Sequence, residues 1–77
     1  MSTEDRVRHV LSVILKIDLP EGQDLRREDE PKWDSLKHVE IVFALEDEFD
    51  VQFDEERMAS LTSLGAIVAA LENPHAA

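Results

Sequence analysis

Apolar residues near the start of the chain recur at intervals of three and four, which predicts an amphipathic helix over residues 3–16. Ser2 or Thr3 can cap the start of this helix, and Lys16 falls in its last predicted turn, where a cation suits the helix dipole. Pro20 ends any continuation of the pattern. The face predicted to pack inward consists of Val7, Val10, Leu11, Ile14 and Leu15.

A polar connection follows over residues 18–33, and it is longer than most links between helices. Gly22 and Pro31 lie within it and disfavour regular structure. Its apolar residues are widely spaced, which indicates that the connection wraps around the domain instead of extending into solvent. The predicted anchors are Leu19, Leu25 and Trp33.

The next two helices have clear start signals. A helix is predicted over residues 35–49, with Asp34 or Ser35 as its cap. After a short link, Asp54 can cap a third and much shorter helix over residues 55–60, whose first turn carries two glutamates.

A fourth helix is predicted to begin after Thr62 or Ser63 and to continue to about Leu71. The Asn-Pro pair at residues 73–74 would stop it and leave a frayed tail. Residues 1–77 are therefore expected to form a single all-α domain, a small four-helix bundle with a long first loop and a short third helix. The inward positions of the last helix would be Leu64, Ile67, Val68 and Leu71.

Composition narrows the function classes. The 77 residues include 18 acidic and 8 basic side chains, a net charge of −10, which disfavours nucleic acid or an anionic membrane as a ligand. There is no cysteine for a disulfide or a thiolate metal site, and the N-terminus lacks the features of a signal peptide. The longest wholly uncharged run, residues 61–71, is too short to span a bilayer. We expect a soluble, cytoplasmic, monomeric protein without a metal.

The negative charge is concentrated in the C-terminal half of the chain. Residues 1–38 hold nine acids and seven bases, whereas residues 39–77 hold nine acids and one base, Arg57. A field of one sign favours fast encounter with a positively charged partner protein, although it also suits a surface that is merely soluble.

The predicted helix over residues 35–49 has two apolar faces. On the side opposite its core stripe, the apolar Leu36 and Phe43 alternate with the acidic Glu40 and Asp47. Burying carboxylates is costly, so this face should remain exposed and suit docking onto a basic, partly apolar partner. The core stripe consists of Ile41, Val42, Leu45 and Phe49.

Ser35 is the main candidate for chemistry, because a helix N-terminus offers free N–H groups and partial positive charge to a phosphate ester. The alternative is that Ser35 only caps the helix. A third reading pairs Ser35 with His38, three residues on, as nucleophile and base, but the sequence has no glycine-flanked nucleophile turn. The acidic run over residues 46–56 lacks the glycine and terminal glutamate of a calcium-binding loop.

Residues 34–50, DSLKHVEIVFALEDEFD, resemble the acyl carrier proteins, in which an Asp-Ser-Leu motif precedes a helix of the form Val-Glu-Leu-Val-x-Ala-Leu-Glu-x-Glu-Phe. The element order, the long first connection and the acidic charge fit the same family along essentially the whole chain. The tryptophan at position 33, directly before the motif, resembles the residue that polyketide-type carriers have there. Lys37 and His38 differ from many fatty-acid carriers and would place positive charge beside the motif.

The resemblance implies a non-catalytic carrier. Ser35 would receive 4′-phosphopantetheine from coenzyme A through a separate phosphopantetheinyl transferase, with Asp34 capping the helix and presenting the serine. Acyl intermediates would be attached to this arm as thioesters. The carrier would deliver them to enzymes of fatty-acid, polyketide or related biosynthesis, such as ligases, acyltransferases and synthases. Leu36, Glu40 and Phe43 match family positions that contact partner enzymes, and Asp47 shares their face.

Two alternatives stay open within this fold. The carrier could instead hold aminoacyl or hydroxyacyl groups loaded by an adenylating ligase, or the chain could be an unmodified acidic adaptor. The interior could also hold the cargo chain between the helices. The residues that would line such a cavity are equally well explained as ordinary hydrophobic core. These residues are Val42, Leu45, Ile67 and Val68.

Overall fold

The computed structural model describes residues 2–72, and these form four α-helices and one short 3-10 helix with no β-strand. The predicted all-α, four-helix fold is confirmed. The predicted Asn-Pro stop and the tail lie outside the described residues. The elements in chain order are α1 (Thr3–Leu15), η1 (Arg27–Asp29), α2 (Ser35–Phe49), α3 (Glu55–Ser60) and α4 (Leu64–Glu72).

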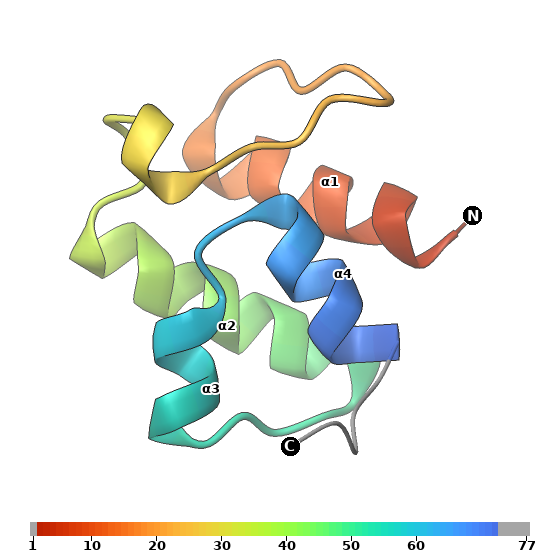
Figure 1. Cartoon of the computed structure of the whole chain (residues 1–77), viewed down its shortest axis with the longest axis vertical. Coiled ribbons are helices and arrows are strands. Elements are labelled where there is room, and N and C mark those ends of the chain that lie inside the picture. The colour runs from red at the N-terminus through yellow and green to blue at the C-terminus, as the bar shows by residue number, and fades with distance from the viewer. Residues whose placement is uncertain (1, 73–77) are drawn as a thin grey trace.

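Helix α1 packs against both α2 and α4, and the long first connection runs back above α1 and past the start of α4 before it reaches the start of α2 through η1 (Figure 1). The inward faces predicted for the helices meet in one core. Trp33 and Phe53, from the two connections that flank α2, and Leu61, from the link between α3 and α4, complete it. Leu19 and Leu25 pack against the core as predicted. The buried helical residues of the core are Val7, Leu11, Leu15, Ile41, Val42, Leu45, Leu64 and Ile67.

Polar side chains start the α-helices where the sequence predicts them. The Ser2 hydroxyl accepts a hydrogen bond from the Asp5 N–H, and the Asp5 carboxylate accepts one from the Ser2 N–H, forming a capping box. Asp54 caps α3, and the Ser63 hydroxyl accepts a hydrogen bond from the Ala66 N–H at the start of α4. Of the predicted alternatives, Ser2 and Ser63 supply the caps.

Two helices end in a left-handed residue that is not glycine. Lys16 has φ 56° and terminates α1, so the predicted last turn ends at Leu15 and Lys16 lies just beyond it. Asp50 has φ 53° and terminates α2, where its N–H donates to the carbonyl of Glu46. A side chain makes this conformation unfavourable, and the carboxylate of Asp50 also meets the negative end of the helix dipole.

Replacing Asp50 by glycine should therefore increase the free energy of unfolding by about 1 kcal/mol. Asp50→Asn is the matched control, because it removes the charge and keeps a side chain in the left-handed conformation. Urea unfolding should show a higher midpoint for Asp50→Gly than for Asp50→Asn, with an unchanged slope. A glycine variant less stable than the wild type would contradict this explanation.

The connection between α1 and α2 is fastened to the link between α3 and α4. The Arg27 N–H donates to the Thr62 carbonyl at 2.8 Å, and the Leu64 N–H donates to the Leu25 carbonyl at 2.8 Å. The carboxylate of Asp24 also accepts a hydrogen bond from the N–H of Gly65, at 2.9 Å. We call these bonds between residues 24–27 and 62–65 the loop–link contact. It fixes the position of η1, which the apolar pattern does not predict.

Two arginines of α1 make side-chain contacts to α2 and to the first connection. Arg6 pairs with Glu48 at 2.9 Å and lies over the ring of Phe49, 4.2 Å from its centroid. Arg8 is buried, pairs with Glu4 at 2.9 Å and donates to the carbonyl of Gln23 in the connection. The contacts to Glu48, Phe49 and Gln23 join segments far apart in sequence.

Candidate functional site

Ser35 is the first residue of α2, and its side chain is exposed. Asp34 caps the helix: its carboxylate accepts a hydrogen bond from the Lys37 N–H at 2.9 Å, and its carbonyl accepts one from the His38 N–H. The reading of Ser35 as a mere helix cap is therefore wrong, because Asp34 has that role. The hydroxyl of Ser35 stands at the positive end of a 15-residue helix, available from solvent.

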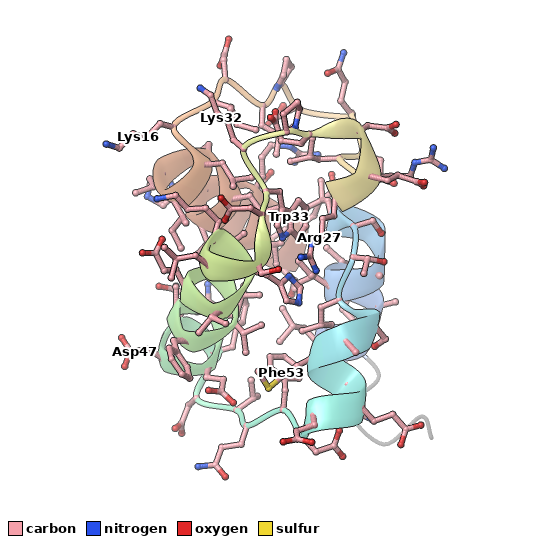
Figure 2. All side chains as sticks on the ribbon, turned by 90° about the vertical axis from the view of Figure 1, so that its left-hand side faces the viewer. Lys16, Arg27, Lys32, Trp33, Asp47 and Phe53 are labelled. Atoms are coloured by element: carbon pink, nitrogen blue, oxygen red, sulfur yellow. The ribbon has the colours of Figure 1, made fainter. Side chains whose placement is uncertain are left out.

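A basic side chain from the long connection reaches this hydroxyl. The guanidinium of Arg27 donates to Ser35 Oγ at 3.3 Å and to the carbonyl of Trp33 at 3.3 Å. Figure 2 shows Arg27 directed toward the start of α2. Sequence reasoning missed this residue, because it lies eight positions before Ser35 in a polar segment with no periodicity.

The neighbouring Arg26 has different partners. Its guanidinium pairs with Asp29 at 3.0 Å and with Glu28 at 3.3 Å. The hydrogen bond and the charge of Asp29, together with the charge of Glu28, raise the pKa of Arg26 above its ordinary value. Of the two adjacent arginines, only Arg27 contacts the serine.

His38 does not pair with Ser35. The indole N–H of Trp33 donates to His38 Nδ1 at 3.0 Å, and His38 Nε2 lies 2.7 Å from the carbonyl of Met58. Since an indole N–H can only donate, Nδ1 is the acceptor and Nε2 carries the proton shared with Met58. Both ring nitrogens are thus committed to structural contacts, and the geometry gives no support to a serine–histidine hydrolase.

The expectation that Lys37 and His38 place positive charge on the surface beside the motif is also corrected by the structure. The side chain of His38 lies on the buried side of α2, with its ring stacked on that of Trp33, and does not contribute to the surface. Lys37 forms an ion pair with Glu40 at 3.3 Å, so its charge is largely compensated within the helix. The surface around Ser35 is shaped by Arg27 instead.

The outer face of α2 is exposed as the sequence predicts. Leu36 is 69% exposed and Phe43 is 61% exposed, and Glu40 and Asp47 are exposed beside them. Asp47 projects away from the body of the molecule (Figure 2). Val39, which the apolar spacing did not assign to this face, is also exposed and lies between Leu36 and Phe43 along the helix. We call Leu36, Val39, Glu40, Phe43 and Asp47 the α2 outer face.

The candidate lining residues for interior cargo are core residues in this structure. Val42, Leu45 and Ile67 are completely buried, and Val68 packs against the same cluster. Within residues 2–72, the structure brings together no group of three His, Cys, Asp or Glu side chains suited to a metal ion. None of the helices described is long and apolar enough to cross a membrane.

The residues around Ser35 fit a phosphodiester. The Ser35 hydroxyl is exposed, the start of α2 supplies backbone N–H groups and partial positive charge, and the Arg27 guanidinium lies within hydrogen-bond distance of the Ser35 oxygen. The exposed position of Ser35 also leaves room for a long substituent. A small helical bundle with an exposed serine at a helix start is an arrangement that suits a carrier domain.

Comparison with known proteins agrees with this class. The family model described as "phosphopantetheine attachment site" matches residues 5–71. Acyl carrier protein 3 of Ralstonia nicotianae is 34% identical over 70 residues, which is 88% of this chain and 79% of the relative. The chain belongs to the acyl carrier protein family, whose members are carriers that hold their cargo on covalent 4′-phosphopantetheine.

Proposed function

We propose that Ser35 is the attachment residue for 4′-phosphopantetheine and that the chain carries acyl groups between enzymes without catalysing a reaction itself. The observation that carries this proposal is the placement of an exposed serine hydroxyl at the start of α2, beside the capping carboxylate of Asp34 and the guanidinium of Arg27. The family match supports the cofactor, and the geometry supports the residue.

In loading, Ser35 Oγ would form a bond to the phosphorus that carries the pantetheine group in coenzyme A. The diphosphate bond of coenzyme A breaks, adenosine 3′,5′-bisphosphate leaves, and the serine proton passes to a base of the transferase. Asp34 holds the first turn of α2 so that Ser35 faces solvent, where a second protein can reach it. When bound, the arm supplies a thiol on which acyl groups are held as thioesters.

The test is the intact mass of the purified full chain before and after incubation with coenzyme A and a phosphopantetheinyl transferase of broad specificity. We expect the chain to gain one phosphopantetheine, and fragmentation of the loaded chain should place the added mass on Ser35. A chain that gains no mass, or gains it at another residue, would overturn the proposal.

The α2 outer face is proposed as the docking surface for the transferase and for acyl-handling enzymes. Its apolar side chains, framed by carboxylates, are suited to a partner that is basic and partly apolar. Weak and fast docking is what a carrier needs, because it must leave one enzyme to visit the next.

Changing the charge of this face should slow loading. Glu40→Lys and Asp47→Lys are each expected to reduce the rate of loading by the transferase, more strongly at low than at high salt. Asp47→Lys should have the larger effect, because Glu40 already forms an ion pair with Lys37. Glu21→Lys, in the exposed first connection, is the matched control for charge. Wild-type rates for both α2 variants would contradict the docking assignment.

For the pathway, we propose fatty-acid, polyketide or related biosynthesis, with the chain acting as a monomer in the cytoplasm. The alternative cargo is an aminoacyl or hydroxyacyl group loaded by an adenylating ligase. Incubating the loaded chain with candidate acyltransferases or ligases and their substrates, and measuring its mass, distinguishes these cargoes. A chain that never accepts the arm would be the unmodified adaptor.

A further inference from the structure

Arg27 is held in place by contacts to three parts of the fold. Its N–H donates to the carbonyl of Thr62, in the link between α3 and α4, and this bond belongs to the loop–link contact. Its side chain then extends back to the residues at the start of α2 and donates to the Trp33 carbonyl and to Ser35 Oγ. An arginine anchored at its backbone and at one nitrogen keeps its remaining donors near the serine at little further cost in conformational freedom.

The charge of Arg27 is not neutralised within the part of the chain that the structure describes. No carboxylate in residues 2–72 lies within ion-pair distance of its guanidinium, whereas Arg26 pairs with Glu28 and Asp29. Of the two lysines near the start of α2, Lys37 pairs with Glu40, and the Lys32 amino group donates to the carbonyl of Lys16 at 3.3 Å. Within those residues, Arg27 is thus the cation next to Ser35 that still lacks an anionic partner.

A phosphodiester at Ser35 would place a negative charge near the carboxylate of Asp34, one residue away. Like charges this close repel each other, and the repulsion would push the phosphodiester away from the start of α2. A guanidinium on the connection side of the serine counteracts this repulsion and can donate two parallel hydrogen bonds to phosphate oxygens.

We propose that Arg27 is a positioning residue that binds the phosphodiester once Ser35 carries the arm, and so holds the base of the arm against the first connection. This inference rests on the proposed function of Ser35. The Arg27 guanidinium would exchange its bond to the serine hydroxyl for charge-assisted bonds to the phosphate oxygens. The first connection, through the loop–link contact, thereby becomes part of the site.

The test compares apo and loaded forms of the full chain as wild type, Arg27→Gln and Arg26→Gln. Arg26→Gln is the matched control, because it removes the same charge from the adjacent position, where the side chain pairs with Asp29. Loading is verified by intact mass, and each form is then measured by thermal unfolding and by ³¹P NMR of the phosphodiester. Comparing loaded with apo protein within each variant cancels any cost of losing the bond to the Trp33 carbonyl.

Loading should raise the Tm of the wild type and of Arg26→Gln by about 4 °C, which is the scale of one favourable ion pair in a domain of this size. Arg27→Gln should lose this increase, and its ³¹P resonance should be displaced from that of the other two proteins. In 1 M NaCl the wild-type increase should shrink. An equal increase in Tm and an equal ³¹P shift in all three proteins would overturn the inference.

If Arg27→Gln does not fold, the wild type alone decides the question. The side-chain N–H signal of Arg27 should move on loading while that of Arg26 stays in place, and an unmoved Arg27 signal in fully loaded protein would overturn the inference. These outcomes leave the attachment at Ser35 intact. A wild-type chain that gains no mass would instead refute the proposed function, and the role of Arg27 with it.

Discussion

Replacing Ser35 by alanine should abolish loading completely, so that the chain keeps its unmodified mass after incubation with coenzyme A and the transferase. The reason is chemical: the new bond forms at the side-chain oxygen, and alanine has none. The fold should be unaffected, because Ser35 is exposed and Asp34, not Ser35, caps α2. We expect the free energy of unfolding to change by no more than about 0.5 kcal/mol.

Ser60→Ala is the matched control for this loss. Ser60 is also exposed, and its hydroxyl donates to the carbonyl of Arg57 within α3. This variant should be loaded like the wild type. If Ser35→Ala still gained a phosphopantetheine while Ser60→Ala did not, the attachment residue would have been assigned wrongly.

Replacing Trp33 by alanine should destabilise the domain severely. Trp33 is only 2% exposed and occupies the core between the first connection and α2. Removing a buried tryptophan costs about 3–5 kcal/mol, a large share of the roughly 5–15 kcal/mol that stabilises a small domain. The Tm of the apo chain should fall by more than about 12 °C, because each kcal/mol shifts Tm by about 4 °C or more.

Trp33→Phe separates packing from hydrogen bonding. Phenylalanine keeps an aromatic ring in the core but lacks the indole N–H, and it therefore leaves His38 Nδ1 without its donor. The expected cost is about 1–3 kcal/mol. Val13→Ala serves as the control for an apolar residue outside the core, because Val13 is 58% exposed, and it should change stability by less than about 0.5 kcal/mol. Equal stability of Trp33→Ala and Val13→Ala would contradict this account of the core.

Much of the fold could be predicted from local signals in the sequence. The third helix is the clearest case: Asp54 caps it, and the structure places it at Glu55–Ser60, the predicted residues. The apolar spacing predicted which sides of α1 and α2 face the core. The sequence could not show that α1 stops before Lys16, because a left-handed lysine has no pattern of its own and is stabilised by the surrounding structure.

The site was predictable as far as it lies on one helix. Ser35 and the α2 outer face share an element, so periodicity and capping locate them together. Arg27 belongs to the first connection and comes close only because distant backbone groups hold that connection in place. His38 is buried, and its bonds to Trp33 and Met58 depend on tertiary contacts that no local pattern reveals.

The loop–link contact also has a consequence for the order of folding. It joins residues between 35 and 41 positions apart, so it must overcome a larger loss of chain entropy than contacts within a helix. Helix α1 packs on α2 and α4 through apolar side chains, whereas this contact consists of hydrogen bonds alone, so we expect it to form after that packing. Asp24→Ala, which removes the carboxylate that accepts from the Gly65 N–H, should therefore accelerate unfolding much more than it slows refolding, as expected for a contact that forms late, on the native side of the transition state.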